Sequence, residues 1–145
     1  MLLIQELIKE KIEALNYAID NIYEVLRLAI DRHKNLFEDA NTSQLNKGLL
    51  NDNNPITPEY RTLTKSIKRL KGQPIDRVTL KDTGAFHKSI TVELYADGLD
   101  FDATDSKTLD LEKKYTINIL GINDEDLKEI LETTIIEEMQ EIINI

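Results

Sequence analysis

Three consecutive residues near the middle of the chain, Asp82, Thr83 and Gly84, have the types and order of a catalytic turn. An aspartate on such a turn works as an acid or a base when a second carboxylate shares its proton, because two like charges held close together do not both ionise. The sequence contains this triplet once, so that chemistry requires two copies of the chain to pair. Lys81 directly before Asp82 opposes it, since a neighbouring ammonium group keeps both carboxylates ionised.

The triplet resembles the active-site turn of retroviral-type aspartic proteases, and the segment INILGIN (residues 117–123) resembles their second glycine-containing segment. This resemblance implies a peptidase that uses Asp82. In that family the triplet follows apolar residues on a strand of an almost entirely β fold, whereas helical patterns cover much of this chain. The alternative is structural: Asp82 or Thr83 accepts backbone N–H groups, and Gly84 supplies the conformational freedom of a turn. We favour the structural interpretation and predict a chain that is not an enzyme.

Other residue types that carry chemistry are sparse. A calcium site is suggested by four aspartates, which are Asp97, Asp100, Asp102 and Asp105. Their spacing does not match the EF-hand loop, and alternating aspartates on a strand also keep sheet edges from pairing. His33 and His87 lie far apart with no third ligand evident, and the absence of cysteine excludes disulfides and thiolate zinc sites. The sequence therefore predicts neither a metal nor another cofactor.

The length of 145 residues and the 41% hydrophobic share predict one folded domain with a modest core. No stretch approaches the roughly 20 uninterrupted apolar residues that span a bilayer. Three glutamates, Glu6, Glu10 and Glu13, interrupt the apolar N-terminal segment, which is atypical of a signal peptide. We therefore expect a soluble chain without membrane contact.

The net charge of −9 is unevenly distributed. Residues 61–90 hold eight basic and two acidic side chains, a net charge of +6, whereas residues 91–145 hold four basic and fifteen acidic ones, a net charge of −11. An acidic chain disfavours general nucleic-acid binding, because phosphate contacts need basic surface. Two interpretations of the basic region stay open: it faces DNA phosphates, or it contacts the acidic surface of a neighbouring copy.

Residues 1–40 are predicted to form one long amphipathic helix, because they lack glycine and proline and their apolar residues recur every three or four positions. At about 1.5 Å per residue, such a helix is longer than a domain of this size covers. Its apolar seam therefore either folds over the domain or packs on another chain. The candidate subunit contacts on this seam are Ile8, Ile12, Leu15, Ile19, Ile22 and Leu26.

Residues 41–58 are predicted to be a loop, because they are rich in Asn, Asp, Ser and Thr and end in two prolines. A short helix is expected next, with Thr57 as its N-cap, Pro58 at its first position and Gly72 beyond its end. The positive side chains of this helix region are further candidate subunit contacts: Arg61, Lys65, Lys68, Arg69 and Lys71.

Residues 59–145 are predicted to form an α+β domain. The segments SITVELYA and LDFDAT alternate apolar and polar residues and flank an Asp97-Gly98 turn, which predicts an antiparallel hairpin. The segment DSKTLDLEKKY predicts a short helix or turn, and Asn123 is expected to cap a last helix that runs to Ile145. A long N-terminal helix, a short basic helix, a small antiparallel sheet and a C-terminal helix define the α+β class.

The segment PITPEYRTLTKSIKRLKGQPIDRVTLKDTGAFHKSITVEL is similar to the central region of bacteriophage tail-completion and head–tail connector (neck) proteins. Those proteins have a Thr-Pro-x-Tyr segment, a basic helix, an Asp-Thr-Gly triplet between apolar residues and a Ser-Ile pair at a strand start. The matching positions are Thr57, Pro58, Tyr60, Leu80, Asp82, Thr83, Gly84, Phe86, Ser89 and Ile90. The similarity covers roughly the C-terminal two-thirds of the chain, where Thr116 occupies a position that is usually glycine in such relatives.

This resemblance implies a non-catalytic virion protein that forms a ring of identical copies, twelve or six, between the portal and the tail. It implies portal or other neck and tail proteins as partners, and contact with DNA if the basic region lines a channel. It places the chain at the head–tail junction of the virion, and in the host cytoplasm during assembly. A cytoplasmic helical adaptor whose partner binds the N-terminal seam is a second alternative, beside the aspartic protease.

Overall fold

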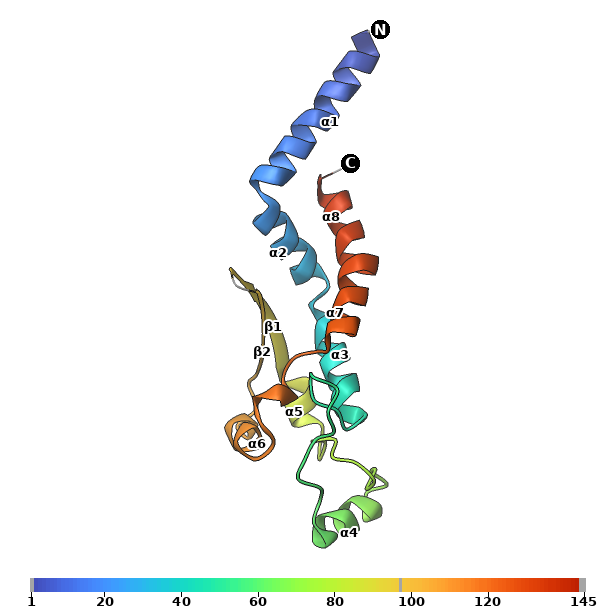
Figure 1. The fold of residues 1–145 in the computed structure, drawn as a ribbon, viewed down its shortest axis with the longest axis vertical. Coiled ribbons are helices and arrows are strands. Elements are labelled where there is room, and N and C mark those ends of the chain that lie inside the picture. The colour runs from blue at the N-terminus through green and yellow to red at the C-terminus, as the bar shows by residue number, and fades with distance from the viewer. Residues whose placement is uncertain (1, 97, 144–145) are drawn as a thin grey trace. The chain divides into compact units, whose positions relative to one another are not determined.

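The computed structural model describes residues 2–96 and 98–143, and the chain divides into two compact units (Figure 1). We call Met1–Lys34 with Lys128–Ile145 the helical unit, and Asn35–Leu127 the mixed unit. The class is α+β, as predicted, with helices in both units and one two-stranded antiparallel sheet in the mixed unit. The division differs from the predicted one, because the last helix groups with the first helices rather than with the sheet.

The helical unit contains the long N-terminal helix, although it is shorter than predicted. Its elements are α1 (Leu2–Asp20), α2 (Ile22–Arg32), a π-helical segment (Leu131–Ile135) and α8 (Ile136–Ile143). The π-helical segment follows directly on α7 (Asp124–Ile130), which begins in the mixed unit and ends in the helical unit. The predicted helix over 1–40 is interrupted at Asn21 and His33. Asn21 ends α1 with two hydrogen bonds to the carbonyl of Tyr17, one from its backbone N–H and one from its side-chain amide, each at 2.9 Å.

The core of the helical unit forms where α8 packs along α2 and the end of α1 (Figure 1). The buried apolar side chains are Ala18, Val25, Ala29, Ile30 and Ile135. Glu138 joins the end of α2 to α8, because Arg32 donates to it at 2.5 Å and His33 Nε2 lies 2.9 Å from its second oxygen. These contacts, that of His33 first, lower the pKa of Glu138.

The mixed unit begins with a helix that continues into the segment where the sequence predicted a loop. Its helices are α3 (Lys34–Asn46), α4 (Thr62–Leu70), α5 (Ala85–Lys88) and α6 (Thr108–Tyr115), with a short 3₁₀ helix (Ile117–Ile119). Since α3 reaches Asn46, the predicted loop 41–58 is corrected over its first part. The basic helix starts at Thr62 with Arg61 as its N-cap, not at Pro58. Gly72 lies beyond its end as predicted, with a φ of 69°.

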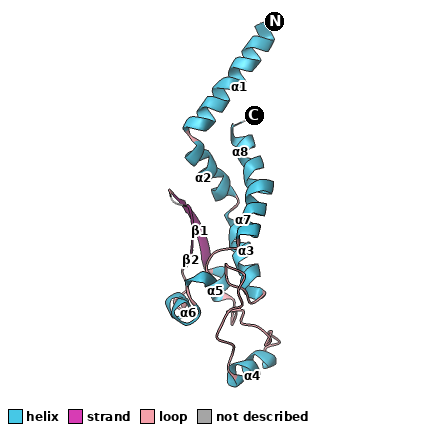
Figure 2. Ribbon diagram, in the orientation of Figure 1, coloured by secondary structure: helices cyan, strands magenta, loops and turns pink. Residues whose placement is uncertain are grey.

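The sheet of the mixed unit is the predicted hairpin of β1 (Ile90–Tyr95) and β2 (Gly98–Ala103), with Ile90 opposite Ala103 and Tyr95 opposite Gly98. Asp97, which belongs to the predicted turn and to the suggested calcium site, lies outside the described residues. Long loop segments connect α4 to the other elements of the mixed unit (Figure 2).

A single apolar cluster supports the mixed unit, and burial of each of its large side chains contributes about 1.5–3 kcal/mol. Its buried members are Leu45, Leu50, Ile56, Val78, Leu80, Phe86, Ile90, Ala103, Tyr115, Ile119 and Leu120. The residues that flank the Asp-Thr-Gly triplet, Leu80 and Phe86, are thus anchored in the core. Within the described part of the chain, no helix has the length and apolar character needed to cross a bilayer.

Two buried amides on α3 hold the turn that precedes α7. Asn41 donates to the carbonyl of Ile119 at 3.0 Å and accepts from the N–H of Gly121 at 2.9 Å. Gln44 donates to the carbonyl of Gly121 at 3.1 Å and accepts from the N–H of Asn123 at 3.1 Å. Asn123 in turn accepts from the N–H of Asp126 at 2.9 Å, which confirms it as the cap of α7.

The Asn41→Ala substitution is expected to lower the free energy of unfolding by about 2–4 kcal/mol, because it leaves two buried backbone groups without partners. Chemical denaturation followed by circular dichroism measures this change. Ser43→Ala is the matched control, since Ser43 is exposed on the same helix and its loss should change stability by less than about 0.5 kcal/mol. Equal effects of the two substitutions would contradict the stabilising role of the Asn41 amide.

Thr116 adopts a backbone conformation that favours glycine. Its φ is 80° and its ψ is 163°, in a region that residues with a Cβ atom occupy at a cost of about 1–3 kcal/mol. Its hydroxyl accepts one hydrogen bond from the N–H of Asn118 at 3.2 Å. The strain therefore exceeds what one exposed hydrogen bond returns, about 0.5–1.5 kcal/mol.

Thr116→Gly should raise the free energy of unfolding by about 1 kcal/mol, because glycine removes the strain at this φ and ψ. Thr116→Ala keeps the Cβ atom and loses the hydroxyl, so it should be less stable than the original chain. Thermal unfolding of the three proteins side by side distinguishes the cases. A glycine variant no more stable than the alanine variant would show that the conformation carries no strain.

Candidate functional site

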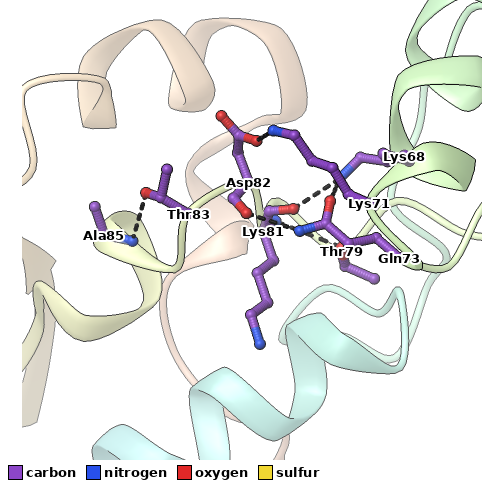
Figure 3. Close-up of polar contacts among 8 residues, drawn as sticks. All are labelled: Lys68, Lys71, Gln73, Thr79, Lys81, Asp82, Thr83 and Ala85. Atoms are coloured by element: carbon purple, nitrogen blue, oxygen red, sulfur yellow. Dashed lines mark hydrogen bonds and ion pairs between the residues drawn. The ribbon is translucent and has the colours of Figure 1, made fainter.

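The Asp-Thr-Gly triplet forms a bend that leads into α5 and then into β1. Gly84 has a φ of 90°, which favours glycine, and precedes the first residue of α5. The Thr83 hydroxyl accepts a hydrogen bond from the N–H of Ala85 at 3.3 Å (Figure 3). The structure therefore places Thr83 and Gly84 at the start of a short helix, in the structural role that the sequence favoured for them.

The carboxylate of Asp82 points to solvent and is paired with a lysine. Its side chain is 58% exposed, and the ammonium group of Lys71 donates to it (Figure 3). This hydrogen bond and the positive charge of Lys71 lower the pKa of Asp82. A carboxylate held in its ionised form is a poor member of a pair that must share one proton.

Gln73 and Lys68 fix the backbone on which Asp82 lies. Gln73 donates to the carbonyl of Asp82 at 2.7 Å, and Lys68 donates to the carbonyl of Lys81 at 2.7 Å and to the side-chain oxygen of Gln73 at 3.3 Å (Figure 3). The ammonium group of Lys68 also lies 4.7 Å from the centre of the Tyr60 ring. Because Lys68 is buried, these contacts replace the water that its ammonium group would otherwise bind.

Tyr60 extends the same network into the core. Its hydroxyl accepts hydrogen bonds from the N–H groups of Thr79 and Leu80, at 3.0 and 3.2 Å. His87 adds a further contact, since its Nε2 lies 2.7 Å from the carbonyl of Thr79. Burial lowers the pKa of His87, which favours the neutral ring with Nε2–H as the donor. Tyr60 and His87 thus fix the backbone of Thr79 and Leu80, which lie just before the triplet.

This network sets the rotation of α4 about its own axis. Lys68, on one face of α4, points inward to Tyr60 and Lys81, so the opposite face points to solvent. That opposite face is apolar, because the exposed residues at spacings of four and three are Leu63 (73%), Ile67 (45%) and Leu70 (90%). An amphipathic helix therefore buries a lysine and exposes its leucines, the reverse of the usual arrangement.

A cavity of about 190 Å³ lies beside the triplet. Its lining includes Tyr60, Lys68, Leu80, residues 82–84, Leu111 and Tyr115. Typical ligand pockets have volumes of about 300–1,000 Å³, so this cavity is small for a peptide substrate. Asp105 and Lys107 also line the cavity, so its lining contains side chains of both signs of charge.

The predicted contact residues are distributed over both units. On the N-terminal seam, Ile8, Ile12, Leu15, Ile19 and Ile22 are exposed and Leu26 is half-buried. Among the predicted basic contacts, Arg61, Arg69 and Lys71 are exposed, Lys65 is half-buried and Lys68 is buried. Lys68 is therefore corrected from a surface contact to an internal one, because its ammonium group is satisfied by the Lys81 carbonyl.

The sequence patterns did not predict the apolar face of α4 or the role of Tyr60. The spacing of Leu63, Ile67 and Leu70 was a usable signal, since positions four and three apart share one face of a helix. No comparable signal marked Gln73, whose partners come from two separate segments. Within residues 2–96 and 98–143, no cluster of three or more His, Cys, Asp or Glu side chains is arranged to hold a metal ion.

Comparison of the chain with models of protein families, with curated proteins and with solved structures finds no match.

The pKa of Asp82 should rise toward its ordinary value of 3.8 in a Lys71→Met variant, because the cation that lowers it is removed. An NMR titration of the side-chain carboxyl carbon measures this pKa in both proteins. In the original chain, the ion pair stabilises the fold above the pKa of an unfolded aspartate, and that contribution disappears as the pH falls through the lower folded pKa. Lys65→Met is the control and should leave the titration unchanged. A titration midpoint of Asp82 above 3.8 in the original chain would contradict the described pairing.

Proposed function

We propose that this chain is a non-enzymatic structural protein of the bacteriophage neck, a head–tail connector or tail-completion protein that forms a ring between the portal and the tail. One observation carries the proposal: the network around Lys68 holds the apolar face of α4 toward solvent, although the single chain offers that face no partner in the described residues. An apolar helix face fixed outward by internal hydrogen bonds is suited to contact with another protein. The similarity around the Asp-Thr-Gly triplet supplies the identity of the assembly.

The charge distribution supports contacts between copies. Arg61, Lys65, Arg69 and Lys71 lie on or beside α4, and no acidic residue lies within Thr62–Leu70. Residues 91–145 carry the opposite charge, −11 in net terms. In a ring, each copy presents one surface to the next copy and a different surface to the previous one, so a basic surface on one side and an acidic surface on the other favour closure. Contact of the basic surface with DNA in a channel is the other use of the same charge.

The aspartic protease alternative has less support. The exposed side chain of Asp82 is paired with Lys71, and the backbone of the triplet is held by Gln73. Removal of peptide cleavage by Asp82→Asn would restore the protease alternative. A helical adaptor is favoured by a different observation, the exposed seam of α1, and a gene located away from portal and tail genes would support it.

The assembly proposal predicts that the purified chain, mixed with the portal and tail proteins encoded beside it, forms rings that electron microscopy and native mass spectrometry detect. Leu70→Asp should weaken ring formation strongly, because it places a carboxylate on the outward apolar face of α4. Leu109→Asp is the matched control, since Leu109 is similarly exposed but lies on α6. Only monomers in the presence of these partners, with the original chain, would refute the proposal.

A further inference from the structure

The aliphatic residues of α1 from Leu3 to Ile19 occupy about half of the circumference of the helix, at about 100° per residue. The exposed ones are Leu3, Ile4, Leu7, Ile8, Ile12, Leu15 and Ile19, each between 45% and 77% exposed. The acidic residues of the helix, Glu6, Glu10, Glu13 and Asp20, fall on the other half. Seven such side chains amount to several hundred Å² of apolar surface, more than a monomer usually leaves in one patch, and of the order that one partner buries in a stable interface, about 800 Å².

The helical unit itself covers little of this apolar half. In the described part of α1, Ala18 is buried and Ala14 is half-buried, where α8 packs against the end of the helix. Towards the N-terminus, α1 extends beyond the described end of α8 (Figure 1). The stripe formed by Ile8, Ile12 and Leu15 therefore remains available to another molecule.

The spacing and the charges identify a second copy of α1 as the occupant. Ile8, Ile12, Leu15 and Ile19 follow the four-three repeat of a helix seam that packs on an identical seam. Lys9 and Lys11 lie beside the stripe, so the basic α4 of another copy would bring like charges together. In a parallel pair in register, Lys9 instead lies opposite Ile4, and Lys11 lies opposite Asn16.

We infer that the apolar half of α1 packs in parallel, and in register, against α1 of a neighbouring copy. The inference rests on the proposed ring in one respect: copies arranged around one rotation axis point the same way along it, so residues of the same number lie at the same height. It names a contact between copies that is separate from the contact proposed for α4.

The absence of cysteine from the chain allows a direct test with single-cysteine variants of the full-length protein. Ile8→Cys and Ile19→Cys should each form covalent dimers with a short thiol-to-thiol crosslinker, because a parallel pair in register brings each position close to its own copy. Tyr17→Cys, on the polar half of α1, should not crosslink. Failure of either seam variant to crosslink would overturn the inference, and an antiparallel pair would produce that failure.

A second measurement uses charge. Ile12→Asp should weaken self-association of the full chain by about thirty-fold or more in sedimentation experiments, because it buries a carboxylate in the seam. Tyr17→Asp places the same charge on the opposite half and should change association little. Circular dichroism checks that both variants keep their helices. Association unaffected by Ile12→Asp would overturn the inference.

The two measurements separate this inference from the proposed function. Rings that form with portal and tail proteins, but without crosslinks at Ile8 and Ile19, would refute the α1 contact and leave the neck function standing. Crosslinked α1 pairs in a chain that never joins portal or tail proteins would support the α1 contact and refute the neck function. A chain that stays monomeric and does not crosslink, even with the portal and tail proteins present, would refute both.

Discussion

The mixed unit depends on two buried amides, those of Asn41 and Gln44. Together they satisfy backbone groups of Ile119, Gly121 and Asn123, which lie at the end of the 3₁₀ helix and in the turn between it and α7. Buried backbone groups without hydrogen bonds are costly, so the two amides of α3 stabilise this turn. Through Asn123, the same turn starts α7. One helix, α3, thus determines where α7 begins.

Lys68 imposes a comparable constraint on the surface. A buried ammonium group needs partners within the protein. The Lys81 carbonyl and the Gln73 side-chain oxygen accept hydrogen bonds from Lys68, and the Tyr60 ring adds a cation–π contact. Satisfying this charge turns the lysine face of α4 inward and the leucine face outward. The contacts of the buried Lys68 therefore leave the apolar face of α4 exposed, and that face is the basis of the proposed role in assembly.

Local patterns predicted much of the fold because they reflect local physics. Alternation over residues 90–95 predicted β1, and the Asn123 cap followed by three acidic residues predicted the start of α7. The end of α3 has the composition of a loop because Asn41, Thr42 and Ser43 favour turns as isolated residues, whereas here the Asn41 amide is used inside the protein. Thr57 and Pro58 have the types of a helix start, but Ile56 and Tyr60 join the core and the helix begins only at Thr62.

The sequence by itself determined the α+β class, the amphipathic character of α1, the hairpin and the unequal distribution of charge, since each follows from residue types and spacing along the chain. Only the tertiary structure decided that the last helix joins the first ones, that Lys71 neutralises Asp82, and that α4 points its leucines outward. These features depend on partners that are distant in sequence or on the rotation of a helix. A pattern along the chain specifies which side of a helix is apolar, but the contacts of the folded protein decide which side is left for another molecule.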